Sequence, residues 1–245
     1  DWRSHSRRMD FIRFTGEWVV YYTLLAIGGG VLIALTAAGF QAIDQDAEVV
    51  LSEWVLPCGA MGAVIVAAWL VEAKQNVIEN IAPVLTRVFT PLATLMLLVY
   101  LVAIVATGDL VDADRELLIL ADLILVLVLG LVLYAVSARD PYAAPVLFDR
   151  LQLVLVVAAL AIDVLMLTAM LGRITELGIT PNRIAALGLN LVLLVNLTWS
   201  ARLLVGISGG GSFGRLERWQ TTYLPVFAVW ASIVVVVFPP AFGWS

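Results

Sequence analysis

The chain has 245 residues, of which 62% are hydrophobic and 13% are charged, and its formal net charge at neutral pH is −5. A soluble domain is nearer one half apolar and one quarter charged, so this composition excludes an ordinary water-soluble fold. The apolar residues stand in blocks of bilayer-spanning length, which indicates that lipid is the solvent for most of the chain.

Seven stretches are long and apolar enough to cross about 30 Å of hydrocarbon, which takes about 20 residues of helix. They are residues 18–40, 54–71, 91–107, 118–137, 151–171, 183–205 and 223–238. An open strand would leave backbone groups unsatisfied in lipid, so each span is predicted to be a helix. We therefore expect an all-α, polytopic transmembrane helical bundle in which residues 1–245 form a single domain, beginning with a basic segment at residues 1–16.

The stretch before the third span, residues 77–90, is mixed in polarity, because Glu79, Pro83 and Arg87 interrupt its apolar residues. We predict an interfacial helix that leads into the membrane. The alternative is a longer tilted span that begins near Ile81.

The fifth and sixth spans have the clearest boundary, in the sequence GRITELGITPNR at residues 172–183. Gly178 suits the left-handed residue that follows a helix end, Thr180 is a suitable N-cap, and Pro181 fits the first helical position after it. These residues predict a tight antiparallel hairpin.

The last connection, residues 208–220, is rich in glycine at its start and is interpreted as a cytoplasmic linker between the last two spans. Residues 209–214 match the pattern G-x-G-x-x-G. They follow a membrane helix rather than a strand, so they do not predict a dinucleotide site.

The positions of the basic residues predict the orientation of the chain. Eleven of the 14 lysines and arginines fall on one side of the spans, so we expect the N-terminus to be cytoplasmic. The three exceptions on the outer side are Arg115, Arg173 and Arg183. The first two outer loops carry a cluster of acids, which are Asp44, Asp46, Glu48, Glu53, Asp109, Asp112, Asp114 and Glu116.

Asp163 is the strongest candidate for a functional residue, because it lies inside the fifth span, about 12 Å from the predicted outer end. An acid at that depth is expected to face the bundle interior or water. Asn190 lies at a similar predicted depth in the next helix, so we expect the two side chains to be neighbours. Asp163, Asn190 and Asn196 form either a polar path or buried groups that hold helices together. Asp122 is interpreted as a rim residue near the headgroups.

Small residues occur in two spans. Three glycines at residues 28–30 permit close packing or local unwinding of the first span, and Gly59 and Ala63 lie one turn apart in the second. Helix packing is the default interpretation of both patterns.

Groups for catalysis are scarce in this sequence. The only histidine, His5, lies in the N-terminal tail, and the only cysteine, Cys58, lies within a span. We therefore predict no catalytic residue, no cofactor site and no metal site. The last span, residues 223–238, contains no lysine, which argues against a retinal protein.

Arg173, Gly178, Thr180 and Arg183, placed between two membrane helices, resemble a hairpin motif of a bacterial family of polytopic membrane proteins known as domain of unknown function 4153. The resemblance is confined to residues 173–183. It implies an integral membrane protein without an assigned reaction, whose motif residues cap the hairpin or bind lipid headgroups.

Together these features favour a multi-pass protein of the bacterial cytoplasmic (inner) membrane that is transport- or permease-like, or a membrane subunit of a transport system. The alternative is a non-catalytic structural or signalling subunit that acts through helix contacts. A weaker third option is an enzyme that acts on lipid-linked substrates. The expected partners are the lipid bilayer and either another membrane subunit or a second copy of the chain, with no nucleic acid.

Overall fold

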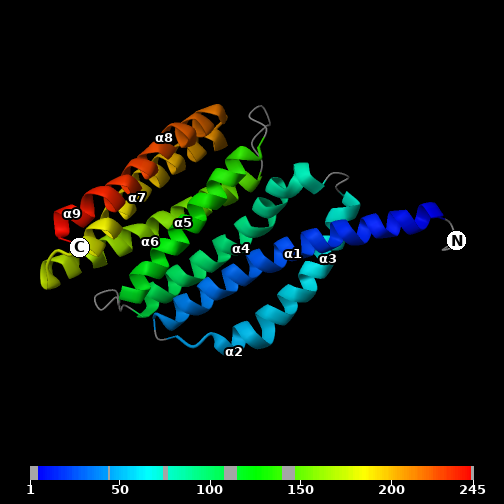
Figure 1. Cartoon of the computed structure of the whole chain (residues 1–245), viewed down its shortest axis with the longest axis horizontal. Coiled ribbons are helices and arrows are strands. Elements are labelled where there is room, and N and C mark those ends of the chain that lie inside the picture. The colour runs from blue at the N-terminus through cyan, green and yellow to red at the C-terminus, as the bar shows by residue number, and fades with distance from the viewer. Residues whose placement is uncertain (1–4, 44, 74–76, 108–114, 140–146, 244–245) are drawn as a thin grey trace. The chain divides into compact units, whose positions relative to one another are not determined.

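The computed structural model describes residues 5–43, 45–73, 77–107, 115–139 and 147–243. Lys74, Asp44 and three acids of the predicted second outer loop (Asp109, Asp112 and Asp114) lie outside these residues. The elements in chain order are α1 (His5–Gln41), α2 (Glu48–Val50), the π-helical turn η1 (Leu51–Val55), α3 (Leu56–Ala73), α4 (Val77–Thr107), α5 (Arg115–Ser137), α6 (Leu147–Leu177), α7 (Pro181–Ser208), α8 (Gly214–Ser232), the π-helical turn η2 (Ile233–Val237) and α9 (Phe238–Phe242) (Figure 1).

Seven helical stretches are long and apolar enough to cross a membrane, and the described residues include no β-strand. The predicted all-α fold with seven spans is therefore confirmed. The helices cluster into two compact units, Asp1–Phe89 and Thr90–Ser245, and α4 runs from the first into the second. The single domain expected for residues 1–245 stays a prediction.

The first unit is built on the pairing of α1 with α3. The indole nitrogen of Trp18 on α1 donates a hydrogen bond to the backbone oxygen of Val64, 3.2 Å away. The helix α1 continues through its three glycines, and a Cβ atom at Gly28 would lie 2.3 Å from the ring of Phe89. Gly28 therefore serves close packing rather than unwinding. At Gly59, in contrast, nothing lies within 4 Å of such a Cβ atom.

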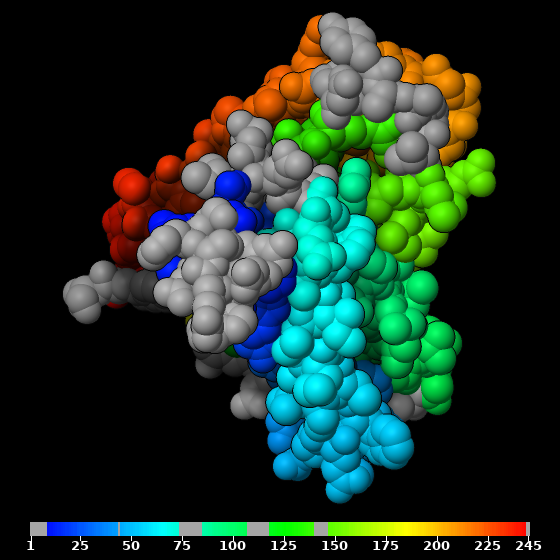
Figure 2. All heavy atoms as spheres, turned by 90° about the vertical axis from the view of Figure 1, so that its right-hand side faces the viewer, coloured from blue at the N-terminus to red at the C-terminus, as the bar shows by residue number. Residues whose placement is uncertain are grey.

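The continuous helical segment of α2, η1 and α3 exposes mainly apolar side chains, and its surface is seen in cyan in Figure 2. Its large exposed apolar residues are Val49, Val50, Trp54, Val55, Leu56, Met61, Ile65 and Trp69. A surface of this kind is suited to contact with hydrocarbon chains, so the exposure is the one expected of a membrane span.

The second unit is built around α6 and α7, which form the most extensive helix pair among the described elements. The helix α5 packs on α6 and the helix α8 packs on α7, so the four helices lie side by side (Figure 1). Their shared core consists of fully buried apolar side chains, including Leu125, Leu155, Ile162, Met166, Leu193, Leu197, Leu204 and Leu216.

Two predicted connections between spans differ from the structure. Residues 77–90 belong to the single continuous helix α4, so the separate interfacial helix is wrong and the alternative of a longer helix is closer. The linker predicted at residues 208–220 is shorter, because α7 ends at Ser208 and α8 already begins at Gly214. The polar residues 215–222 form the first turns of a helix whose partner is α7.

Each of the two π-helical turns ends two residues before a proline. Pro57 follows η1, and Pro239 and Pro240 follow η2. A proline has no backbone N–H and its ring crowds the preceding turn, so it cannot close a regular α-helical hydrogen bond. A wider turn before the proline lets each span continue without a break.

Candidate functional site

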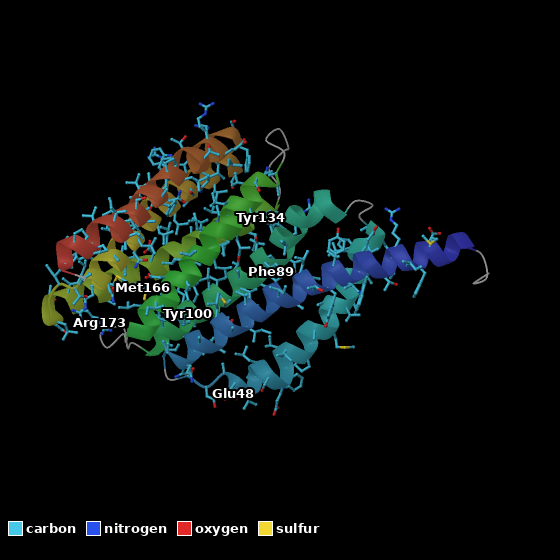
Figure 3. All side chains as sticks on the ribbon, viewed as in Figure 1. Glu48, Phe89, Tyr100, Tyr134, Met166 and Arg173 are labelled. Carbon is cyan, nitrogen blue, oxygen red and sulfur yellow. The ribbon has the colours of Figure 1, made fainter. Side chains whose placement is uncertain are left out.

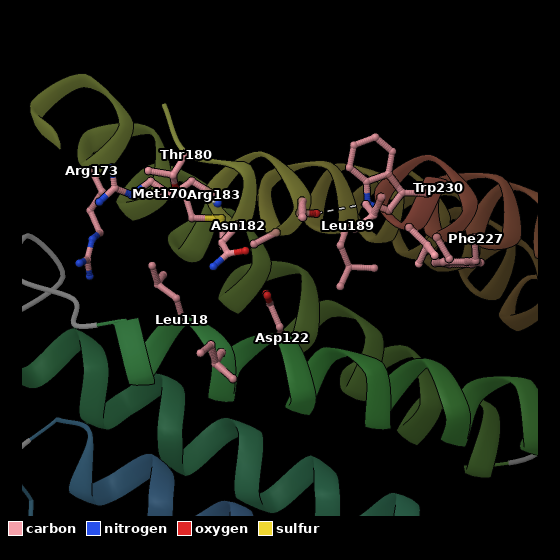
Figure 4. A pocket seen from close by; sticks show the side chains of 16 residues that line it. Leu118, Asp122, Met170, Arg173, Thr180, Asn182, Arg183, Leu189, Phe227 and Trp230 are labelled. Carbon is pink, nitrogen blue, oxygen red and sulfur yellow. Dashed lines mark hydrogen bonds between the residues drawn. The ribbon is translucent and has the colours of Figure 1, made fainter. Parts of the chain in front are cut away.

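A cavity of about 940 Å³ lies in the second unit between α5, α6, α7, α8 and η2. One end is polar, where Arg173, Thr180, Asn182 and Arg183 surround the turn between α6 and α7. The carboxyl group of Asp122 enters the same space from α5 (Figure 4). The rest of the lining is apolar and comprises Leu118, Ile119, Met170, Ala185, Ala186, Leu189, Phe227, Trp230, Ala231, Val234 and Val235.

The α6–α7 hairpin that forms the polar end follows the sequence prediction. The helix α6 ends at Leu177, and Gly178 has a φ of 79°, which is the left-handed conformation. The Thr180 hydroxyl accepts a hydrogen bond from the Arg183 backbone nitrogen at 3.4 Å, and Pro181 is the first residue of α7. These residues fix the direction in which the chain turns.

Arg183 stabilises this turn with its side chain as well. Its Nη1 atom donates to the backbone oxygens of Leu177 and Gly178, at 3.0 and 2.7 Å. These oxygens belong to the end of a helix, where backbone acceptors have no partner within the helix. The guanidinium group of Arg183 is therefore held in place at the rim of the cavity.

The apolar wall depends on a close approach between α7 and α8. A Cβ atom at Gly188 would lie 1.9 Å from the ring of Trp230, so only glycine leaves room for this indole. The indole nitrogen of Trp230 donates to the backbone oxygen of Ala185, at 3.2 Å (Figure 4). Gly188 could not be recognised from the sequence, because a single glycine within an apolar span gives no specific signal.

Asp122 and Asn190 are joined by a hydrogen bond at the inner side of the cavity. The Asn190 Nδ2 atom donates to Asp122 Oδ1 at 2.9 Å and contacts the Met170 sulfur at 3.5 Å. The interpretation of Asp122 as a rim residue is therefore wrong, since its carboxyl group turns toward the neighbouring helices. Hydropathy could not show this, because α5 is apolar on most of its faces.

Asp163 is fully buried, and neither of its carboxyl oxygens has a hydrogen-bond partner among the residues that the structure describes. The Oδ1 atom of fully buried Asn190 likewise has none within that part of the chain. The carboxyl groups of Asp163 and Asp122 are close enough to interact electrostatically. We call Asp122, Asp163 and Asn190 the carboxyl cluster.

The depth of Asp163 differs from the prediction. Because α6 continues to Leu177, Asp163 lies 14 residues from its end, which corresponds to about 21 Å. Asn190 is level with Met170, the residue that it contacts, and Met170 is about two turns nearer the hairpin than Asp163. Figure 3 shows Arg173 near the hairpin end of α6 and Met166 deeper in the unit. Asp163 and Asn190 are thus not at matched depth, and Asp122 connects them.

Asn196 belongs to a second buried group, which we call the amide cluster and which also contains Ser200 and Gln220. Asn196 Nδ2 donates to Gln220 Oε1 at 3.1 Å, and Gln220 Nε2 donates to Ser200 Oγ at 2.8 Å and to Asn196 Oδ1 at 3.5 Å. All three side chains are buried. The shared face of Asn196 and Ser200 was predicted, whereas Gln220 was missed because it lay in the predicted linker.

A buried ion pair lies at the end of the second unit opposite the hairpin. Arg139, after α5, pairs with the fully buried Asp149 in the first turn of α6. The guanidinium carbon of Arg139 also lies 4.7 Å from the ring centre of Phe213, directly before α8. Burial lowers the pKa of the Arg139 guanidinium, which still keeps its charge because arginine titrates far above neutral pH.

The fold and these buried polar groups define a multi-pass integral membrane protein. No family model matches the chain, and comparisons with curated proteins and with solved structures also give no match. Among the described residues, no group of three or more His, Cys, Asp or Glu side chains is placed to hold a metal ion.

Proposed function

We propose that the protein is transport- or permease-like, or the membrane subunit of a transport system, and that Asp163 is the residue that takes up and releases a proton. The observation that carries this proposal is the fully buried carboxyl group of Asp163, whose two oxygens lack a hydrogen-bond donor among the described residues. A negative charge in that position would be costly, so a buried acid within a span is by default a functional site.

Asp122 supports this assignment, because it lines the cavity and interacts electrostatically with Asp163. A proton that enters from the cavity is accepted by the Asp122 carboxylate and passes through water to Asp163. The bond from Asn190 to Asp122 positions the first carboxyl group for this step.

The proposal places the protein in a bacterial cytoplasmic membrane with its hairpin on the outer side, as the distribution of arginines predicts. Membership of the family known as domain of unknown function 4153 is also part of the proposal. It is supported by Arg173, Gly178, Thr180 and Arg183 at the hairpin and by nothing further along the chain.

The test is proton movement into liposomes that contain the purified protein and an internal pH-sensitive dye. An imposed membrane potential should acidify the interior faster than in empty liposomes, and Asp163→Asn should remove most of the difference. Asp10→Asn, a matched change at an exposed residue of α1, should leave the rate unchanged. Equal rates in wild type and Asp163→Asn would exclude a proton-carrying role for Asp163.

The alternative function, a structural or signalling subunit, is favoured by the amide cluster alone, which joins α7 to α8 and leaves none of its three side chains without a bond. In that case Asp163→Asn would alter stability and no flux. A partner that purifies in a fixed ratio with the chain would support it.

A further inference from the structure

The cavity in the second unit has two chemically different ends, and we propose that it binds an acidic membrane lipid, with the lipid phosphate beside Arg173 and Arg183 and an acyl chain along the apolar wall. This inference goes beyond the proposed proton movement. It concerns lipid binding only, so its test is independent of the test of proton movement.

The polar end offers positive charge in a fixed position. Arg183 is held by its bonds to the backbone oxygens of Leu177 and Gly178, and Arg173 lines the cavity from the last turns of α6. Arginine suits phosphate because its planar guanidinium group can donate two parallel hydrogen bonds. A cation that is already held in place loses less conformational freedom when it binds a ligand.

The cavity runs from the end of the spans into the depth of the membrane. From Thr180 at the hairpin to Leu189, both of which line it, the rise along α7 is about 14 Å. That distance is close to half the thickness of the hydrocarbon core, which is about 30 Å. A ligand that fills the cavity therefore has its charged group at the level of lipid headgroups and its remainder at the level of acyl chains. This depth favours a lipid over a water-soluble phosphate.

The deeper wall has the chemistry of a chain-binding surface. Phe227, Trp230, Val234 and Val235 contribute carbon surface from α8 and η2, opposite Leu189 on α7. The indole N–H of Trp230 is already bonded to the backbone of α7, so its ring presents only apolar atoms to a ligand. An acyl chain can therefore lie against this wall without burying a polar group that lacks a hydrogen-bond partner.

The negative charge of the ligand is the property that the two arginines recognise. Asp122 lies deeper in the cavity, where it accepts a hydrogen bond from Asn190, so an anionic group is favoured at the arginine end and not beside this carboxyl group. Phosphatidylglycerol carries one negative charge on its phosphodiester and is the probe that we choose.

The experiment measures lipid bound to the full-length protein in a neutral detergent by native mass spectrometry. The protein is titrated with phosphatidylglycerol and, separately, with phosphatidylcholine of the same acyl chains. We expect one phosphatidylglycerol to bind roughly tenfold more tightly than phosphatidylcholine, and Arg173→Gln to remove most of that preference. Arg218→Gln, at an exposed arginine of α8 outside the cavity, should leave the preference unchanged.

Ala231→Trp provides a second variant that changes no charge. Ala231 is an exposed cavity residue, so a tryptophan there fills the chain-binding wall without disturbing a packed core. It should weaken the binding of both lipids. Equal binding of the two lipids, unchanged binding in both cavity variants, or displacement of the lipid by inorganic phosphate at millimolar concentration would each overturn the proposal.

Asp163→Asn separates this inference from the proposed function. It should abolish proton movement and leave phosphatidylglycerol binding intact, because Asp163 does not line the cavity. Loss of lipid binding in the cavity variants together with normal proton movement would still support the lipid site.

Discussion

The amide cluster and the carboxyl cluster each contain a residue of α7, and they differ in whether their hydrogen bonds are complete. In the amide cluster, Asn196 and Gln220 exchange bonds and Ser200 accepts a third. In the carboxyl cluster, Asn190 gives its hydrogens to Asp122 and Met170, while its own oxygen and both oxygens of Asp163 lack a donor among the described residues. An amide can satisfy another amide, but carboxylates bring only acceptors.

This difference distinguishes the two clusters more clearly than residue type or depth does. Asn190 and Asn196 are the same amino acid, six positions apart and equally buried. A network in which every hydrogen bond is made stabilises the fold and needs no further ligand. A buried acceptor without a donor calls for a proton, a water molecule or a ligand, and the proposal of proton uptake at Asp163 rests on this property.

The largest effect is expected in the amide cluster. Asn196→Leu should lower the free energy of unfolding by about 2–4 kcal/mol, because the buried Gln220 loses the donor to its Oε1 atom and one of the two acceptors of its Nε2 atom. Titration with sodium dodecyl sulfate in mixed micelles measures this quantity. The double variant with Gln220→Leu should lose less than the sum of the single losses, since the two residues share their bonds. Strict additivity would contradict the described network.

The second-largest effect on stability is expected at the close contact between α7 and α8. Gly188→Leu should cost about 1–3 kcal/mol in the same titration, because the new side chain collides with the ring of Trp230. Gly172→Leu is the matched control, since nothing lies within 4 Å of a Cβ atom there. Combining Gly188→Leu with Trp230→Ala should recover part of the loss. No recovery would show that the indole does not occupy the space beside Gly188.

A substitution in the hairpin between α6 and α7 should have a smaller effect on the free energy of unfolding. Thr180→Ala removes the N-cap of α7 and should cost about 1 kcal/mol. Thr175→Ala is a suitable control, because that hydroxyl only bonds to the Gly172 oxygen of its own helix. Thermal unfolding followed by circular dichroism compares the two variants. Equal midpoints would argue against a capping role for Thr180.

The smallest effect on stability is expected at the most buried acid. Asp163→Leu removes no hydrogen bond that the described residues make, so the free energy of unfolding should change by less than about 1 kcal/mol or increase. The same titration in mixed micelles measures it. A loss as large as that of Asn196→Leu would place Asp163 among the structural groups and erase the distinction between the two clusters.

Much of the fold could be predicted from the sequence, because a span must be long, apolar and helical wherever it stands. The hairpin could be predicted in detail, since Gly178, Thr180 and Pro181 each favour one backbone conformation. Hydropathy left open whether residues 77–90 continue into α4, because their mixed polarity is compatible with both a separate helix and a longer one. The polar start of α8 was assigned to the linker for a similar reason.

The candidate site could be predicted less completely. Burial of Asp163 followed from its position within an apolar run, but its depth required the true end of α6, which continues through the polar residues 172–177. The direction of the Asp122 side chain depends on how α5 is rotated against α6 and α7. That rotation is set by packing between helices, and a single sequence carries little information about it.

The ion pair between Arg139 and Asp149 has a mechanical consequence. Arg139 fastens α5 to α6 and also rests on the ring of Phe213, which precedes α8, so one side chain bridges two helix pairs. Separation of the pairs at that end would break this ion pair and leave the buried Asp149 without its partner. Any separation of the four helices is therefore easier at the opposite end of the unit. That end holds the cavity.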